Sequence, residues 1–420
     1  MPSNLYRRAQ YTTLLKRLTN PPLRLIIITG PRQVGKTTLI ELVLADSALE
    51  KPARLINVDD PLPGIAPTAL TETDTFPAKD TAWLVRQWEL ARVTAHQSDK
   101  GLVLVFDEIQ RIPRWSETVK GLWDADRASR LDMHVVLLGS SPLLVQRGLT
   151  ESLMGRFELI RLGHWSFLEM HEAFGWSLNE YLYFGGYPGS ASYIRDERRW
   201  REYVRDSLIA PSIERDVFDL NRVDKKHLLK HLFRLGCDYS GQIFSFSKMA
   251  EHLRDPDDKT KGHTNTIADY LELLMQAGLL TGLQMYSRNR LRMRASPPKL
   301  NVMNTALMSV ETGYSFEAAK ADRTYWGRLV ESAVGSHLYN TGLGDCPLYY
   351  WRKSPVEVDF VLARGRNVTA IEVKSGKAPT SVPGLHAFAK AFPGCNTLIV
   401  GEGGIDLSEF LSYPAAHWLK

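Results

Sequence analysis

The sequence has little cysteine and no long apolar run. Its 420 residues include only Cys237, Cys346 and Cys395, whose spacing fits neither a disulfide framework nor a zinc site. No apolar run approaches the roughly 18 residues of a membrane-spanning helix. The basic start MPSNLYRRAQ is not followed by the apolar segment of a secretory signal. These absences favour reduced thiols, a cytoplasmic location and no membrane partner.

A large excess of either charge is also absent. The net charge is +5, and 44% hydrophobic with 24% charged residues is the composition of an ordinary globular protein. So small an excess permits a nucleic-acid partner without requiring one. The length predicts two to four domains, because single cores stop growing at about 250–300 residues.

A phosphate-binding loop is the strongest motif. The apolar run LRLIIIT leads into GPRQVGKT and then into the helix-like TTLIELVLA, which is the strand, loop and helix context that the motif requires. We expect Lys36 to reach the β- and γ-phosphates of ATP and Thr37 to bind Mg²⁺. The predicted nucleotide-binding residues are Gly30, Pro31, Arg32, Gln33, Val34, Gly35, Lys36, Thr37, Thr38 and Ser140.

Two acids follow a second buried run, GLVLVFDEIQ. Parallel strands deliver their terminal residues to one edge of a sheet, so Asp107 is expected to hold Mg²⁺ and Glu108 to polarise the attacking water. A third run, VVLLGSS, ends at Ser140 and Ser141. The sequence leaves open whether a hydroxyl there contacts the γ-phosphate or caps the next helix.

The order of these motifs resembles that of a known ATPase group. GPRQVGKT, LVFDEIQ, VVLLGSS and LMGRFELIRL together look like the bacterial and archaeal ATPases of the AAA+ and STAND-like MNS group. The resemblance implies a P-loop AAA+-like parallel sheet over residues 1–165, with ATP and Mg²⁺ as cofactors, in a homo-oligomer. It also implies that Arg156 is an arginine finger for a neighbouring subunit's nucleotide; a plain surface charge is the alternative.

Residues 166–320 are expected to be helical and to contain a winged helix-turn-helix at about 241–294. GQIFSFSKMAEHL and GHTNTIADYLELLMQAGLL read as two helices, and TGLQMYSRNRLRMRAS reads as a basic hairpin. DNA is the expected partner, RNA is not excluded, and a protein-binding module stays open. On an extended wing, a period of two predicts one phosphate-facing row, formed by Arg288, Arg290, Arg292 and Arg294.

Residues 321–420 carry a different motif. The helix-like DRTYWGRLVESAVGSHLYN contains Glu331, and the strands EVDFVLA and VTAIEVKSG are joined by the turn RGRN. Asp359 lies on the first strand, with Glu372 and Lys374 on the second. Opposed across a hairpin, the two acids are expected to bind Mg²⁺ while Lys374 activates water. The alternative is an exposed strand with a paired Glu and Lys.

This D…ExK arrangement resembles the PD-(D/E)xK nuclease superfamily. The resemblance implies a restriction-endonuclease-like α/β domain with Asp359, Glu372 and Lys374 as catalytic residues, and with Glu331 completing the metal site. The resulting hypothesis is an AAA+-like ATPase that acts on DNA and is coupled to a metal-dependent nuclease-like domain. Two alternatives remain. One is an ATP-driven switch whose last domain only binds nucleic acid or a partner, and the other is an assembly factor.

Overall fold

The computed structural model describes residues 5–60, 79–139, 152–218, 223–253, 264–376 and 382–419. The chain divides into two compact units, Met1–Leu162 and Gly163–Lys420. This division lies close to the predicted boundary at residue 165, whereas the boundary predicted at residue 320 falls inside the second unit. Each unit is therefore described by itself.

The first unit contains a parallel five-stranded sheet with the strand order β2-β3-β4-β1-β5. Its strands are β1 (Leu25–Thr29), β2 (Ala53–Asn57), β3 (Leu102–Asp107), β4 (Met133–Gly139) and β5 (Phe157–Arg161). The three central strands, β1, β3 and β4, are buried along their whole length, as expected for a parallel sheet covered on both faces. All five carboxyl ends meet at one edge.

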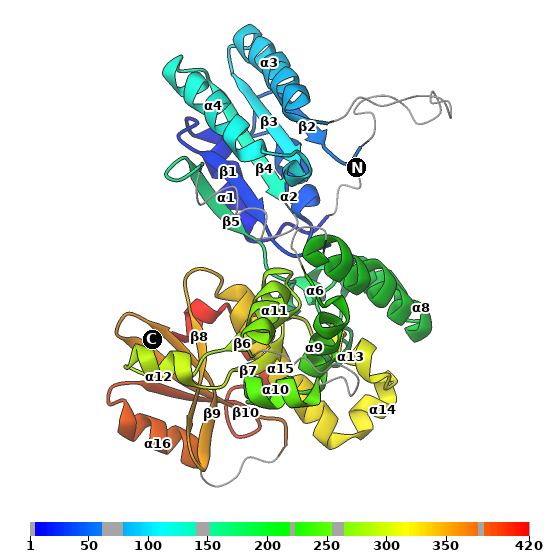
Figure 1. Cartoon of the computed structure of the whole chain (residues 1–420), viewed down its shortest axis with the longest axis vertical. Coiled ribbons are helices and arrows are strands. Elements are labelled where there is room, and N and C mark those ends of the chain that lie inside the picture. Colours follow the sequence, from blue (N-terminus) through cyan, green and yellow to red (C-terminus); the bar gives the residue numbers. More distant parts are fainter. Residues whose placement is uncertain are drawn as a thin grey trace. The chain divides into compact units, whose positions relative to one another are not determined.

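Helices cover both faces of this sheet (Figure 1). They are α1 (Gln10–Thr19), α2 (Lys36–Leu44), α3 (Thr81–Gln97) and α4 (Trp115–Ala128), with a 3₁₀ turn at Ile109–Arg111. Alternate residues of a strand point to opposite faces. Leu104 accordingly packs in the cluster with α3 and α4, and Val105 in the cluster with α1 and α2.

The second unit begins with short helices and a small sheet. The α-helices are α6 (Phe167–Phe174), α7 (Leu178–Phe184), α8 (Glu197–Glu202), α9 (Lys226–Asp238), α10 (Phe246–His252), α11 (Thr264–Gln276), α12 (Arg290–Ala295), α13 (Ala306–Thr312) and α14 (Phe316–Ala321). The other helical segments are Pro188–Tyr193, Tyr203–Ile209 and Ser212–Phe218. β6 (Leu280–Leu283) and β7 (Lys299–Val302) form an antiparallel pair. Two helices are followed by two paired strands, but β7 lies beyond the segment 281–296 that was predicted to form the hairpin.

The expected wing is wrong in one respect. The chain between β6 and β7 contains the helix α12, so the extended strand that was to carry a row of arginines is not present. Arg288 is exposed, and its guanidinium lies 5.6 Å from the centre of the Phe392 ring. The structure does not describe the side chains of Arg290, Arg292 and Arg294.

The second unit ends in a mixed four-stranded sheet of order β11-β10-β9-β8. Its strands are β8 (Leu348–Lys353), β9 (Val356–Arg364), β10 (Asn367–Lys374) and β11 (Asn396–Gly401). The helices are α15 (Arg323–Thr341), α16 (Pro383–Ala391) and α17 (Leu407–Ser412), followed by a 3₁₀ turn at Ala415–Trp418. The predicted hairpin is the antiparallel pair β9 and β10, with Phe360 opposite Ile371. The helix α15 packs against both β7 and β10.

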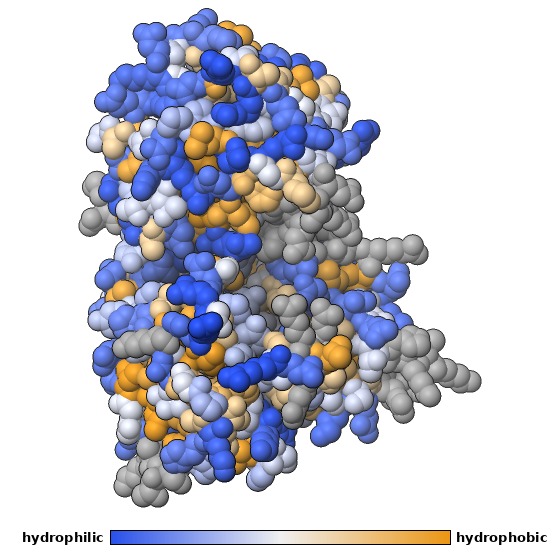
Figure 2. All heavy atoms as spheres, turned by 90° about the vertical axis from the view of Figure 1, so that its left-hand side faces the viewer, coloured by the Kyte–Doolittle hydropathy of each residue, from blue (hydrophilic) through white to orange (hydrophobic). Residues whose placement is uncertain are grey.

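On the face shown in Figure 2, hydrophilic side chains are common and hydrophobic residues gather in separate patches. Exposed large apolar residues include Leu23, Met154 and Leu291; isolated exposure of this kind is normal for protein surfaces. Within the described ranges, no helix combines the length and hydrophobicity that crossing a bilayer requires.

Candidate functional sites

The predicted phosphate-binding loop connects β1 to α2. Gly35 has a φ of 86° and Gln33 a φ of 60°, so both lie in the left-handed region. At Gly30 a Cβ atom would lie 2.3 Å from the carbonyl oxygen of Leu162. The two glycines of the motif therefore meet two different requirements: Gly30 allows close packing, and Gly35 allows the turn into α2.

Lys36 and Thr37 begin α2 and direct polar groups to the carboxyl edge of the sheet. The buried Lys36 Nζ donates to the carbonyl oxygens of Gly30 and Pro31, at 2.9 and 2.8 Å. Thr37 Oγ1 donates to Asp107 Oδ2 at 2.6 Å. A hydroxyl and a carboxylate are the hard oxygen ligands that Mg²⁺ takes beside a phosphate, so these two residues fit a Mg²⁺ ion.

The strand order explains how residues so distant in sequence meet. β4 lies between β1 and β3, with Gly139 beside Thr29 and Leu137 beside Phe106. The carboxyl end of β4 consequently separates the phosphate loop from the two acids. Ser140 and Ser141, which follow it, lie outside the described residues.

Glu108 follows Asp107 in a left-handed conformation, with a φ of 56°. Gln110 Nε2 donates to Glu108 Oε2. Burial raises the pKa of Glu108; Lys36 opposes this shift and Asp107 adds to it. A carboxylate with a raised pKa accepts a proton more readily, which is what a general base requires.

Arg8 was not selected from the sequence. It is buried, and its Nη1 donates to the carbonyl oxygen of Val34 at 3.1 Å, so it supports the phosphate loop. The only signal in the sequence is the basic stretch near the start of the chain, which resembles an ordinary charged surface.

Arg156 lies at the opposite edge of the sheet. Its carbonyl accepts the backbone N–H of Leu25 at the start of β1. Its guanidinium makes a bidentate contact with Asp124 of α4, with Nε–Oδ1 at 2.8 Å and Nη2–Oδ2 at 3.0 Å. Arg156 is separated from the phosphate loop by the length of β1, roughly 15 Å. Arg156 is therefore in no position to contact nucleotide in its own subunit.

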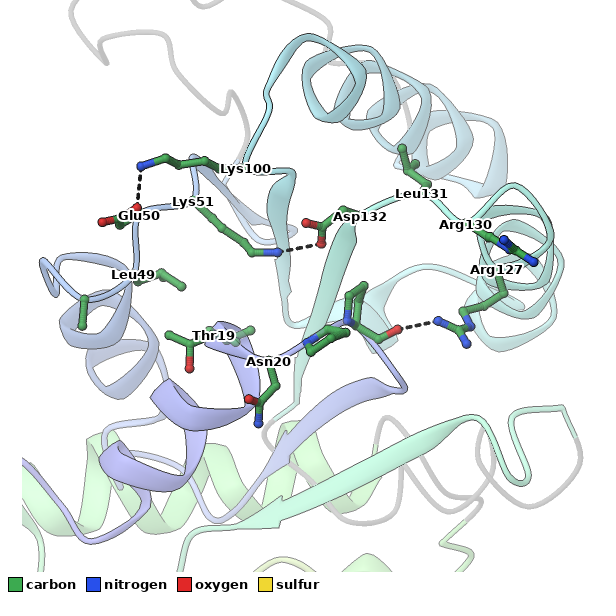
Figure 3. Close-up of a pocket in the computed structure, with 14 residues that line it drawn as sticks. Thr19, Asn20, Leu49, Glu50, Lys51, Lys100, Arg127, Arg130, Leu131 and Asp132 are labelled. Carbon is green, nitrogen blue, oxygen red and sulfur yellow. Dashed lines mark hydrogen bonds and ion pairs between the residues drawn. The ribbon is translucent and has the colours of Figure 1, made fainter.

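A cavity of about 740 Å³ lies at this same far edge (Figure 3). The segments that precede β1, β2, β3 and β4 line it. Lys51 donates to Asp132 Oδ1 at 2.6 Å, and Lys100 pairs with Glu50 at 2.5 Å. None of the predicted nucleotide-binding residues lines this cavity, and Lys51 and Lys100 are already paired, so we do not assign the nucleotide to it.

In the second unit the structure brings the D…ExK residues together. Asp359 on β9 and Glu372 on β10 are both buried. Asp359 Oδ2 accepts the backbone N–H of Val373 at 2.8 Å, and Lys374 Nζ donates to Glu372 Oε1 at 2.7 Å. A cavity of about 410 Å³ adjoins Lys374 and is lined in part by Trp326 and Asp406.

A lysine that was not predicted lies among these acids. Lys299, the first residue of β7, is 1% exposed. Its Nζ is 2.7 Å from Glu331 Oε1 and 3.4 Å from Asp359 Oδ1. It also donates to the carbonyl oxygen of Asp359 at 3.3 Å. No motif marks this residue in the sequence.

This lysine bears on the predicted metal site. Across the described part of the chain, no three His, Cys, Asp or Glu side chains are placed to hold a metal ion. Glu331, Asp359 and Glu372 therefore do not fit Mg²⁺ in this conformation, because the ammonium of Lys299 lies between the first two. The three-carboxylate metal site therefore remains a prediction from the sequence.

The charges of the cluster agree with this geometry. Burial raises the pKa of Glu331 to about 7; Lys299 opposes the shift and Asp359 adds to it. Burial also raises the pKa of Glu372, with Asp359 adding to the shift and Lys374 opposing it. Burial lowers the pKa of Lys299, but Glu331 and Asp359 outweigh it, so the pKa lies above its ordinary value. Lys299 is therefore charged.

Three family models match successive parts of the chain. Residues 23–171 match the AAA domain family. Residues 175–317 and 326–409 match two domains of unknown function, DUF8612 and DUF4143. The parallel five-stranded sheet of the first unit is like the core of the P-loop AAA+ fold.

Two curated relatives are uncharacterised proteins of Mycobacterium tuberculosis and Mycobacterium bovis. Each is 27% identical over 377 residues, which is 89% of this chain and 75% of the relative.

The similar solved structures are more distant. One is the RuvB Holliday junction branch migration motor of Thermotoga maritima, at 17% identity, 65% of this chain, 87% of that chain and a TM-score of 0.32. Another is the Orc1 protein of Aeropyrum pernix in complex with DNA. It is 14% identical, the match covers 76% of this chain and 95% of that chain, and the TM-score is 0.30. At such TM-scores neither likeness supports a conclusion about this chain.

Proposed function

We propose that the first unit binds ATP with Mg²⁺ and hydrolyses it. The observation that carries the proposal is the convergence of Lys36, the Thr37–Asp107 pair and Glu108 at one edge of the sheet. Lys36 exchanges its contacts with loop carbonyls for phosphate oxygens. Glu108 orients a water and accepts its proton as it attacks the terminal phosphate. Bound Mg²⁺, held by Thr37 and Asp107, supplies charge neutralisation for the phosphates.

The first experiment measures the affinity for a fluorescent ATP analogue. Lys36→Ala is expected to lose at least roughly tenfold in affinity, because it removes a charge-assisted contact worth about 1.5–3 kcal/mol. Lys100→Ala is the matched control, since Lys100 lies at the far edge of the sheet and pairs with Glu50. Equal affinity in Lys36→Ala and Lys100→Ala would refute the nucleotide site.

We further propose that Arg156 acts on the nucleotide of a neighbouring subunit in a homo-oligomer. Two observations support this role: Arg156 lies far from its own phosphate loop, and its side chain is 33% exposed. Asp124 keeps the side chain oriented outside the core. An arginine finger supplied in trans stabilises the charge of the transition state.

For the second unit we propose a winged helix-turn-helix joined to a PD-(D/E)xK-like domain that binds nucleic acid without cutting it. The helix pair α10 and α11 followed by β6 and β7 supports the first part, and the β9–β10 hairpin with Asp359, Glu372 and Lys374 supports the second. The ammonium of Lys299 favours binding over metal-dependent cleavage. ATP turnover then drives a switch that acts on DNA or RNA.

Two measurements test this proposal. Binding of labelled DNA and RNA is expected to weaken with salt, and a variant with Arg288, Arg290, Arg292 and Arg294 all changed to Ala is expected to show a smaller salt dependence. An unchanged slope would remove these arginines from the interface. Cleavage with Mg²⁺ or Mn²⁺ that is lost in Asp359→Ala would show an active nuclease instead.

A further inference from the structure

The buried lysine of β7 belongs neither to the nucleotide site nor to the D…ExK motif. Lysine is almost never fully buried unless its charge is paired. Here Lys299 is 1% exposed, and its ammonium contacts groups from two other elements, α15 and β9. It thus joins the small β6–β7 sheet to the four-stranded sheet.

The ligands of this ammonium are those of a hard divalent cation. Carboxylate oxygens of Glu331 and Asp359 and one backbone carbonyl oxygen surround Lys299 Nζ, at 2.7, 3.4 and 3.3 Å. Mg²⁺ and Mn²⁺ take the same kinds of oxygen. An ammonium and a divalent ion therefore cannot occupy this position together.

The backbone around Lys299 holds it in place. β7 pairs with β6, with Lys299 opposite Leu283, and Lys299 also bridges to Ile243. The N–H of Gly241 donates to Leu300, and Gly241 has a φ of 84°. A Cβ atom at Gly241 would lie 3.2 Å from Glu331 Oε1, so this turn lies close against the carboxylate.

One oxygen of the cluster has no partner. Glu372 Oε2 is buried and accepts no hydrogen bond, although Glu372 Oε1 accepts one from Lys374. Glu372 is only 9% exposed. An unsatisfied buried carboxylate oxygen beside Asp359 is a ligand that a cation in the cluster would use.

We propose that Lys299 is a built-in cation that closes a latent divalent-cation site formed by Glu331, Asp359 and Glu372. While β7 lies against α15 and β9, the ammonium replaces the metal. When the ammonium is removed, the same oxygens bind Mg²⁺ or Mn²⁺. The inference depends on contacts within the second unit and is independent of ATP hydrolysis in the first.

The test counts bound Mn²⁺ by electron paramagnetic resonance in the full chain carrying Asp107→Asn, which removes the metal ligand of the nucleotide site. This protein is expected to show no Mn²⁺ site that depends on Glu331. Adding Lys299→Ala is expected to create one Mn²⁺ site whose affinity is at least tenfold higher than any Mn²⁺ binding by the Asp107→Asn protein. Adding Glu331→Gln to that variant is expected to abolish the site. Lys299→Arg, which keeps the charge, is the matched control and gains no site.

Two results would overturn the proposal. The first is a Mn²⁺ site in the Asp107→Asn protein that Glu331→Gln removes, because the position would then be open despite Lys299. The second is a folded Lys299→Ala variant without added Mn²⁺ affinity. If the protein with Asp107→Asn and Lys299→Ala is unstable, millimolar Mn²⁺ is expected to raise its melting temperature, and failure to do so counts against the proposal.

Discussion

His134 on β4 is a buried titratable residue of the first unit. It is 1% exposed, and its Nε2–H donates to the carbonyl oxygen of Asn20 at 2.8 Å. Burial, with a smaller contribution from the nearby Lys51, lowers the pKa of His134 to about 4. The folded unit therefore keeps this imidazole neutral at pH values where an unfolded chain would protonate it.

The sign of the pH effect follows. The folded pKa of His134 is below the unfolded value near 6.5. The stability that neutral His134 contributes to the fold is therefore fully present above pH 6.5 and is lost as the pH falls toward 4. Linkage gives a loss of about 2 kcal/mol between pH 7 and 5. Urea unfolding at these pH values is expected to show this loss in the wild type and a smaller loss in His134→Gln. Equal losses in both proteins would refute the assignment.

Residue positions could be predicted where a motif fixes them. Lys36, Thr37, Asp107 and Glu108 follow strands at fixed spacings, and the structure places all four at one edge. Lys299 could not be predicted, because its role exists only when β7 packs against α15 and β9. A single lysine in a four-residue strand leaves no periodic signal.

Among the elements, the phosphate loop has no room for a side chain at Gly30. Gly30→Ala places a methyl group against the backbone oxygen of Leu162, so β5 or the loop must move. ATP affinity is expected to fall at least roughly tenfold, because a loss of about 1.4 kcal/mol in binding free energy lowers the affinity tenfold. Isothermal titration calorimetry measures the change.

Gly121→Ala on α4 is the matched control. Gly121 is exposed, and no atom lies within 4 Å of its Cβ position. Alanine there is expected to leave ATP affinity unchanged and to stabilise the helix by about 0.5–1 kcal/mol. A similar loss of affinity in both variants would show that Gly30 has no special role.

The extended strand expected at Arg288–Arg294 is absent for a local physical reason. The residues from Arg290 to Ala295 read RLRMRA, and Arg, Leu, Met and Ala are all strong helix formers. Their intrinsic preference outweighed the period-two pattern of arginines. The hairpin of β9 and β10 was predictable, because alternating apolar residues flank a short turn there.

For the whole molecule, the position of Arg156 predicts that ATP turnover depends on assembly of a homo-oligomer. Turnover per chain is expected to rise with protein concentration in the wild type. Arg156→Ala is expected to be slower by about 10³-fold or more and to lose this dependence. Stability changes little, because the pair with Asp124 is substantially exposed.

Arg127→Ala is the control for this experiment. Arg127 lies at the same edge of the sheet and donates to the carbonyl oxygen of Pro22. The Arg127→Ala variant is expected to retain wild-type turnover. If turnover per chain is independent of concentration in the wild type and unchanged in Arg156→Ala, the arginine does not act in trans.

The proposed hydrolysis of ATP by the first unit depends on Glu108 as the base. Its most direct test compares phosphate release and ATP binding in the wild type and Glu108→Gln, with Glu117→Gln, an exposed residue of α4, as the control. The variant is expected to bind ATP within about twofold of the wild type and to turn it over at least roughly 100-fold more slowly. Normal turnover by Glu108→Gln, or no Mg²⁺-dependent hydrolysis by the wild type, would contradict the account.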